Sequence, residues 1–315
     1  MKRASRVVVA VVVAASLLAG ATAVSAHGNH LSADSQVSGD GSVMVERLFV
    51  DQDSYLVLHA DDEGEPGEVI GHKPLRRGFH SPISVNMSDE FWGSMSGNET
   101  VWAVLHEDNG DGTFDPETDG ELQGFGGAAA TPITVRKGAG SVAVAASGFS
   151  VKEAQNGTVF LPQITTSQSS FVVLKTNTNG QPGTIVGHTA LEAGTTTNVS
   201  VAVDLAYYDD QQAQFLLWAT VYADDGDGTF DPETDRLVTA GDQPVASLFT
   251  VKKPLGNDNG DGGLVNTPSA TATQSATETT EPAATTTTST DGPGFGLLSA
   301  IAGVTLLSVL LGRKR

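Results

Sequence analysis

The sequence contains no cysteine among its 315 residues. Disulfide bonds, thiolate metal sites and cysteine nucleophiles are therefore excluded. The patterns Gly-x-Ser-x-Gly and His-Glu-x-x-His are also missing, as is a phosphate-binding glycine loop. No motif thus predicts an enzyme, and stability has to come from packing and from any ions that the chain binds.

Basic residues are scarce, with 17 Lys and Arg against 37 Asp and Glu. Six of the basic residues lie at the two ends, which leaves 11 against all 37 acids between residues 27 and 312, a formal net charge of −26. So acidic a chain has no basic surface for nucleic acid. It fits an exported protein that surface carboxylates keep hydrated, as in saline surroundings.

The amino terminus has the pattern of a secretory signal peptide, residues 1–26. Three basic residues precede an apolar run over 7–18, and Val24-Ser25-Ala26 forms a small-residue cleavage pattern. Cleavage would leave His27 and His30 next to a free amino group. We expect a mobile terminus there rather than a copper or nickel site.

One acidic, glycine-rich segment occurs twice, at residues 108–119 and 224–235, with eleven of twelve positions identical. The offset of 116 residues holds without insertion from Gly41/Gly157 to Lys137/Lys253. This tandem duplication predicts two similar domains, 27–138 and 139–254, each long enough to fold alone.

Apolar residues alternate with polar ones in short runs separated by Gly, Pro, Asp and Asn, which is typical of strands. The sequence therefore predicts an all-β chain with two tandem immunoglobulin-like β-sandwich domains. Trp102 and Trp218 are expected in the cores, with sugar stacking as the alternative. The runs are Val43, Val45; Leu56, Leu58; Val101, Ala103, Leu105; Ile133, Val135; and Val159, Leu161; Val172, Leu174; Leu217, Ala219, Val221; Phe249, Val251.

The repeated segment resembles a calcium loop, because carboxylate and amide oxygens around a Gly turn can surround a hard cation. The match to the EF-hand template is incomplete, since Glu107 or Ala223 stands at position one and Thr118 or Thr234 at position twelve. A rigid acidic hairpin loop without an ion is the alternative. The candidate ligands are Asn109, Asp111, Asp115 and Asp119 in the first copy and Asp225, Asp227, Asp231 and Asp235 in the second.

Histidines recur at only one position of the repeat, His72 and His188. Two further histidines of the first copy, His59 and His106, are replaced by Lys175 and Tyr222. A transition-metal site would need ligands that the second copy lacks, so we expect histidines that cap strand ends.

The chain beyond the repeats has two parts. Residues 255–292 are rich in Thr, Ser and Pro and predict a disordered stalk, either O-glycosylated or a plain spacer. Residues 293–315 contain an apolar run followed by a basic end. With the stalk and the signal peptide, the tripeptide Pro293-Gly294-Phe295 resembles the PGF-type C-terminal sorting signal of haloarchaeal surface proteins. That resemblance implies removal of the tail by an archaeosortase and a lipid anchor, whereas a retained membrane helix is the alternative.

The two repeats also resemble an uncharacterised domain family of secreted haloarchaeal proteins. The resemblance lies in Val57-Leu58-His59, residues 67–72, Leu75, Gly78, the acidic segment and their counterparts in the second copy. It implies a location and an architecture but no reaction. Four sequons fit an exported glycoprotein, at Asn86, Asn98, Asn156 and Asn198.

Together these patterns predict a non-catalytic, exported glycoprotein anchored at its C-terminus. Its role would be structural, adhesive or binding, with partners in the cell envelope or surface layer and with calcium as the candidate ion. The alternative is a secreted protein that binds a small ligand or a metal ion, which would need a concave pocket lined by aromatic side chains.

Overall fold

The computed structural model describes residues 28–148, 152–154 and 156–254. These residues belong to one compact unit. The predicted signal peptide (1–26), stalk (255–292) and sorting signal (293–315) lie outside the described residues. No helix among the residues described is long and apolar enough to cross a membrane.

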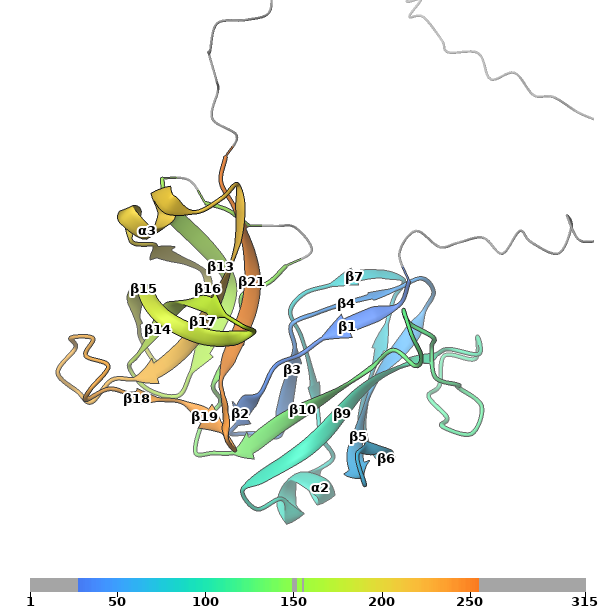
Figure 1. Cartoon of the computed structure of the whole chain (residues 1–315). Coiled ribbons are helices and arrows are strands. Elements are labelled where there is room, and N and C mark those ends of the chain that lie inside the picture. Colours follow the sequence, from blue (N-terminus) through green and yellow to red (C-terminus); the bar gives the residue numbers. More distant parts are fainter. Residues whose placement is uncertain (1–27, 149–151, 155, 255–315) are drawn as a thin grey trace, which may run out of the picture. The chain divides into compact units, whose positions relative to one another are not determined.

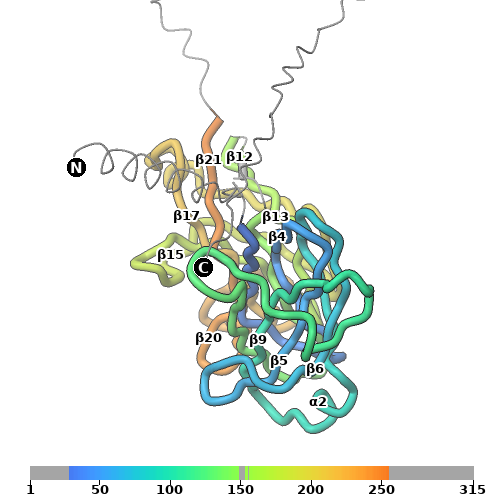
Figure 2. The backbone as a smooth tube through the Cα atoms, turned by 90° about the vertical axis from the view of Figure 1, so that its right-hand side faces the viewer, coloured from blue at the N-terminus to red at the C-terminus, as the bar shows by residue number. Residues whose placement is uncertain are grey.

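The first domain is a sandwich of two layers (Figures 1 and 2). One layer has five strands in the order β2-β10-β9-β5-β6, and the other consists of β1-β4-β7 and the pair β3-β8. Helix α2 spans Asp89–Ser94. The strands are β1 (His30–Ser32), β2 (Gln36–Ser38), β3 (Ser42–Val45), β4 (Arg47–Val50), β5 (Ser54–Asp62), β6 (Glu65–Leu75), β7 (Gly78–His80), β8 (Ile83–Asn86), β9 (Asn98–Glu107) and β10 (Ala130–Lys137).

The second domain repeats this plan. Its large sheet has the order β12-β21-β17-β14-β15 with β18 beside β17, and its small sheet has the order β11-β13-β16. A two-stranded hairpin, β19-β20, and helix α3 (Leu205–Asp210) complete it. The strands are β11 (Ala143–Ala145), β12 (Lys152–Glu153), β13 (Thr158–Thr166), β14 (Ser170–Thr178), β15 (Gln181–Leu191), β16 (Gly194–Ala202), β17 (Gln214–Ala223), β18 (Arg236–Leu237), β19 (Thr239–Ala240), β20 (Gln243–Pro244) and β21 (Ala246–Lys252).

The fold class is the one that the sequence predicts, two tandem immunoglobulin-like β-sandwiches. One detail differs, because β2 runs parallel to β10 and β12 runs parallel to β21. Parallel neighbours need a long connection, and here most of a domain lies between the two strands. The two helices were not expected, since six residues are too few to show a helical period; Ser88 and Asp204 cap them.

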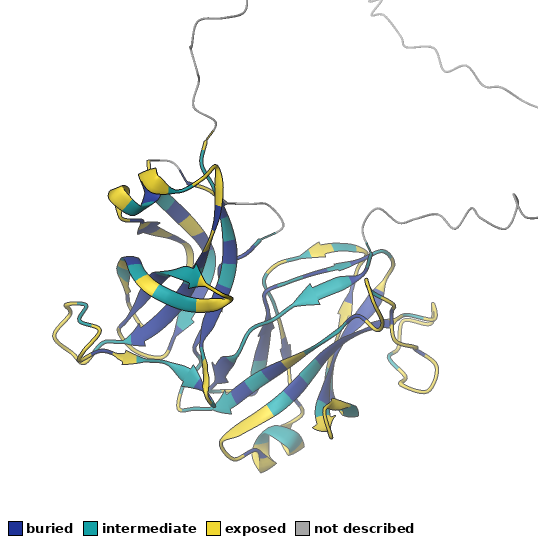
Figure 3. Ribbon diagram, in the orientation of Figure 1, coloured by how far each residue is buried: buried dark blue, intermediate teal, exposed yellow. Residues whose placement is uncertain are grey.

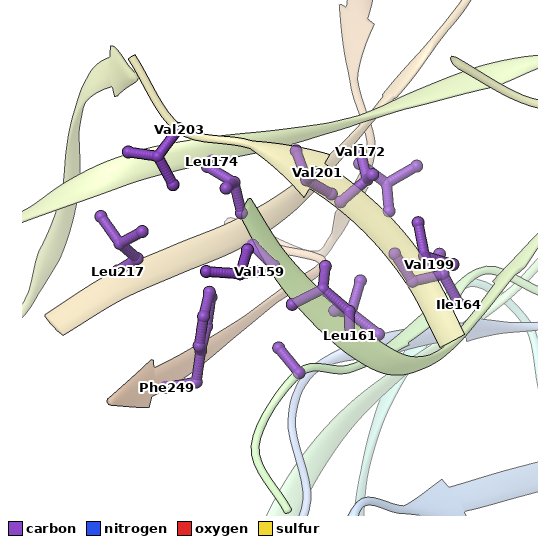
Figure 4. Packing of buried hydrophobic residues seen from close by; sticks show 14 of the residues in the cluster. Val159, Leu161, Ile164, Val172, Leu174, Val199, Val201, Val203, Leu217 and Phe249 are labelled. Atoms are coloured by element: carbon purple, nitrogen blue, oxygen red, sulfur yellow. The ribbon is translucent and has the colours of Figure 1, made fainter. Parts of the chain in front are cut away.

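Each domain has its own apolar core between the two layers (Figure 3), and the alternating residues predicted from the sequence are all buried there. Burying one Val, Leu or Phe side chain contributes about 1.5–3 kcal/mol. Figure 4 shows this packing in the second domain, where the side chains that meet include Val159, Leu161, Ile164, Val172, Leu174, Val199, Val201, Val203, Leu217 and Phe249.

The two tryptophans are not core residues, contrary to the sequence prediction. Trp102 shares the outward face of β9 with His106, because its neighbours Val101 and Ala103 point into the core. Its indole Nε1 donates to Asp61 Oδ1 at 2.7 Å. Trp218 Nε1 donates in the same way to Asn177 Oδ1 at 3.0 Å. Both rings are half-buried and tie the outer sheet face to a hairpin turn.

A buried carboxylate joins the two repeats. Glu46 lies between β3 and β4 and is 2% exposed. Its Oε1 accepts hydrogen bonds from Ala146 N at 2.7 Å, Ser147 N at 2.6 Å and Ser247 Oγ at 2.6 Å. Three donors from the second copy thus compensate for the burial of this charge.

Candidate functional site

The two acidic segments form matching surface loops that follow β9 and β17. A phenylalanine anchors each loop to the outer face of the large sheet. Phe114 packs on Tyr55, His72 and His106, with ring centroids 5.3, 4.8 and 5.6 Å away. The second domain repeats these contacts with Phe230 on Phe171, His188 and Tyr222 at 5.4, 4.7 and 5.5 Å.

The last aspartate of each loop is buried and closes it. Asp119 is fully buried, and its Oδ1 and Oδ2 accept from the backbone N–H groups of Asn109 at 3.2 Å and Asp115 at 2.9 Å. Asp235 is 5% exposed, and its carboxylate closes the second loop through the equivalent bonds, 3.1 and 2.8 Å long. The structure thus places these two predicted ligands beneath the loop as internal braces.

The other predicted ligands turn the chain through short-range hydrogen bonds. In the first loop Asn109 Oδ1 accepts from Asp111 N at 3.0 Å, Asp111 Oδ1 from Thr113 N at 2.8 Å, and Asp115 Oδ1 from Glu117 N at 2.9 Å. These are Asx turns, which fix a tight loop without outside contacts. The second loop has the same three bonds, made by Asp225, Asp227 and Asp231.

A further aspartate that the sequence template left out completes each loop. Asp108 Oδ1 accepts from Gly110 N at 2.9 Å and from Gly112 N at 3.2 Å. Both glycines have positive φ, 101° and 72°, which a side chain would oppose. Asp224 does the same in the second loop. The EF-hand register missed this residue because it puts Asp108 at position two, where no ligand is expected.

Three carboxylates of the second loop lie close enough to hold one cation. Oxygens of Asp224, Asp225 and Asp227 are within 4.8 Å of one another. The first loop has the amide of Asn109 where the second has Asp225. Oxygen ligands of this kind suit Ca²⁺. The negative charge of the first loop also acts on a residue of the sheet. The pKa of Tyr55 is raised mainly by burial and further by the charges of Asp108, Asp119 and Asp111.

The recurring histidines do not cap strand ends, as the sequence suggested. His72 and His188 lie within β6 and β15, and both pack against the loop phenylalanine. An apolar contact with the loop thus explains why both copies have histidine here.

Two further histidines of the first domain, His59 and His106, are 47 residues apart in the sequence but meet on the outer sheet face. His59 and His106 are 6% and 5% exposed, and their Nε2 atoms are 3.2 Å apart. Burial lowers the pKa of His59, as does the neighbouring charge of His106, whereas the Gly67 carbonyl and Glu121 oppose this. In the second domain Lys175 Nζ donates to Tyr222 Oη at 2.6 Å in the equivalent place.

A cleft of about 720 Å³ lies in the second domain at the open edge between β15 and β16. Its lining includes His188, Asp204 and Tyr207, and burial raises the pKa of Tyr207. The remaining lining residues are Thr176, Thr184, Ile185, Val186, Gly187, Ala202 and Val203.

The four sequon asparagines, Asn86, Asn98, Asn156 and Asn198, are all exposed. One of them also contacts the other repeat, since Asn98 Oδ1 accepts from Gly241 N at 2.7 Å. Accessibility is necessary for a glycan, so glycosylation stays a prediction at each of them.

Several solved structures show distant similarity to this chain. CBD12 from CALX1.2 has 10% identity, over 72% of this chain and 99% of that one, with a TM-score of 0.19. The periplasmic chaperone SfaE has 10% identity, over 72% and 98%, with a TM-score of 0.21. A bacterial adhesin from Mobiluncus mulieris has 10% identity, over 72% and 97%, with a TM-score of 0.19. Scores this low support no statement about function.

No curated protein matches the sequence. A family model does, and it matches twice, over residues 29–142 and 145–252, which together make up most of the chain. Both matches contain one acidic loop and the phenylalanine that anchors it. The chain therefore belongs to the family described as "Domain of unknown function (DUF7282)", of which it has two tandem copies.

Proposed function

We propose that this is a non-catalytic, exported protein anchored to the cell envelope at its C-terminus, whose two domains have a structural, adhesive or binding role and whose acidic loops bind calcium. The observation that carries the proposal is the loop itself. The two copies, 116 residues apart in the sequence, share seven hydrogen bonds from backbone N–H groups to side-chain oxygens. The loop is thus kept in both copies of the duplicated domain, and it presents clustered carboxylates in the second.

Calcium fits the oxygens that the loops present. Each Asx turn uses one oxygen of its aspartate, which leaves the second oxygen of Asp111, Asp225 and Asp227 to face a cation. Ca²⁺ accepts six to eight oxygens at about 2.3–2.6 Å, and water can complete its shell. An ion bound there would offset the repulsion among the carboxylates and stabilise the folded state.

Calcium binding is tested by thermal unfolding of the exported chain with Ca²⁺ and with a chelator at fixed ionic strength. Fixed ionic strength is essential, because salt alone screens repulsion among the acids. We expect Ca²⁺ to raise Tm by several degrees by mass action. Asp111→Asn/Asp227→Asn, which keeps the turn acceptors, should lose most of the increase.

The matched control Glu117→Gln/Glu233→Gln removes as much charge from the same loops and should keep the increase in Tm. Equal Tm with calcium and chelator in the wild type would contradict the proposal.

Anchoring is supported by the sequence of residues 255–315. The tripeptide at Pro293, the apolar run and the basic end are together typical of a processed tail. We expect the mature protein to lack Arg313, Lys314 and Arg315, to have a lipid near the tripeptide and to remain with the envelope. Mass spectrometry of the envelope-bound protein checks this, and a dominant intact C-terminal peptide would indicate a retained membrane helix instead.

A second candidate function is small-ligand binding in the cleft between β15 and β16. The favouring observation is the cleft itself, whose lining combines one aromatic ring, one imidazole and one carboxylate with apolar side chains. Sugars combine hydroxyls with an apolar face and suit such a surface. A thermal-shift series with mono- and disaccharides, compared between wild type and Tyr207→Ala, tests it. A shift present in the wild type and lost in the variant is expected, and no shift with any sugar would contradict this candidate.

A further inference from the structure

The side chains of His59 and His106 point toward each other on the outer sheet face of the first domain. They come from neighbouring strands, β5 and β9, where Val57 and Val104 form the pair between them. The ring planes differ by 17° and the centroids are 5.3 Å apart, with the two Nε2 atoms 3.2 Å from each other. Each imidazole is held from behind. His59 Nδ1 lies 2.8 Å from the carbonyl oxygen of Gly67, and His106 Nδ1 lies 2.8 Å from that of Asp119.

Counting protons shows what this arrangement requires. A carbonyl oxygen only accepts, so both Nδ1 atoms must be protonated. The contact between the two Nε2 atoms then needs a third proton, but two neutral imidazoles have only two. In any neutral state one of the three contacts brings two lone pairs together. The pair is thus satisfied only when a positive ion, either a proton or a metal cation, lies between the Nε2 atoms.

We propose that His59 and His106 bind one transition-metal cation of the class that prefers imidazole, with Zn²⁺ as its representative. A histidine that ligates a metal usually donates its other ring N–H to a carbonyl or carboxylate, which fixes the tautomer, and both rings do so here. Two nitrogens about 2.05 Å from one tetrahedral Zn²⁺ would be about 3.4 Å apart. The observed 3.2 Å lies close to that value.

The second domain supports the requirement for a cation. The residues at the two histidine positions are Lys175 and Tyr222, so a lysine amino group occupies the place that the first domain leaves to a bound ion. A third position differs as well. Glu121, whose charge acts on His59, corresponds to Leu237. The domain without the histidine pair thus also lacks the carboxylate.

Glu121 and water are the remaining ligands that this site offers. Glu121 is exposed, and its backbone forms a β-bridge with that of His106, so the residue lies beside the histidine pair. The site also adjoins the acidic loop, because the Asp119 carbonyl that orients His106 belongs to the residue that closes the loop. A metal ion would therefore stiffen the loop from below. The inference does not depend on calcium, since Ca²⁺ prefers oxygen and Zn²⁺ prefers nitrogen.

Zinc titration of the exported chain by calorimetry, in excess Ca²⁺, tests the inference. We expect a site that His59→Lys/His106→Tyr abolishes, with an affinity loss of at least a hundredfold. This variant copies the pair of the second domain and is therefore expected to fold. The matched control His30→Ala/His80→Ala removes two other imidazoles and should keep the site. Zinc bound equally by both variants would overturn the proposal.

X-ray absorption of the zinc-loaded wild type gives a readout that needs no variant. We expect two imidazole nitrogens at about 2.0–2.1 Å in the zinc shell. A shell of oxygens alone would overturn the proposal. So would a wild type that binds no zinc but shows one strongly deshielded imidazole proton by NMR, because the cation between the rings would then be a proton.

Discussion

Asp119 and Asp235 are carboxylates with almost no contact with water, in loops that otherwise lie in solvent. No ion pair compensates for their burial among the residues that the structure describes, where the only salt bridge joins Lys252 and Glu153 at 3.8 Å. Two backbone N–H donors do so instead. Hydrogen bonds to an ionised acceptor are stronger than neutral ones, and two of them fix the loop ends in space.

We expect Asp119→Asn to lower the free energy of unfolding by about 2 kcal/mol, because the amide nitrogen would face a backbone N–H with no acceptor between them. Asp111→Asn is the control. Its exposed side chain can keep the single turn hydrogen bond, so its effect should stay within about 0.5 kcal/mol. Denaturant unfolding in the presence of a chelator, which removes any contribution of calcium, measures both, and similar losses in the two variants would contradict the bracing role.

The residue level also shows where the sequence was informative. Side chains alternate between the two faces of a strand, so the inward positions of Val101 and Ala103 require Trp102 to point outward. The expectation of a core tryptophan did not take this alternation into account. The sequence shows that Lys175 and Tyr222 replace His59 and His106 in the second copy, but it does not show that the two histidines are in contact. Their contact depends on a register that places them on one face, four positions apart along neighbouring strands. No local pattern encodes that register.

At the level of elements, one close contact sets how the edge strand of each large sheet lies against the small sheet. Gly71 in β6 lies against the backbone carbonyl of Asn86 at the end of β8, and a Cβ there would overlap that oxygen. Gly187 lies in the same way against Ala202 at the end of β16. The sequence shows that this glycine is repeated. It could not show why, because the carbonyl that requires a glycine belongs to a strand of the other sheet.

Replacing Gly71 by Ala should therefore lower the free energy of unfolding by more than 2 kcal/mol, since the obstacle is backbone and cannot rotate away. Gly93 provides the opposite control. It lies in α2 with open space around the place of a Cβ, so Gly93→Ala should stabilise the protein by roughly 0.5–1 kcal/mol. Chemical denaturation at one pH compares the two, and a neutral Gly71→Ala would show that the sheets can move apart at little cost.

At the level of the whole molecule, the repeats are joined by more than a linker. Arg136 Nε donates to the Thr239 carbonyl at 2.7 Å, and Glu46 collects three donors from the second copy. The sequence predicts domains that fold alone, because the register of the repeat is unbroken. It could not predict this junction, since Glu46 corresponds to Pro162 in the second copy and so stands outside the repeat pattern. Separating the domains would expose Glu46 and leave its partners to water.

A second carboxylate at this junction makes its strength depend on pH. Asp34 is half-buried, and its pKa is raised to about 7 by burial and by the charge of Glu46. The hydroxyl of Ser247 and the charge of Arg47 oppose this rise. Because the folded-state pKa lies above the ordinary value of 3.8, the folded protein binds more protons than the unfolded chain between these pH values. The free energy of unfolding should therefore fall as pH rises from about 4 to 7.

Asp34→Asn replaces the protonated acid by a neutral side chain of the same shape and should remove this loss. We expect the variant to be as stable as the wild type below about pH 4 and more stable by roughly 2 kcal/mol above pH 7. This gain is smaller than the full pKa shift implies, because Asp34 is only partly buried.

Asp40 is a control of opposite sign. Hydrogen bonds from Ser42, and more weakly from Ser141, lower its pKa, so Asp40→Asn should lose stability above its pKa. Denaturant unfolding from pH 4 to 8 checks both. If the Asp34→Asn and wild-type curves ran parallel over this range, the two carboxylates would not interact across the junction.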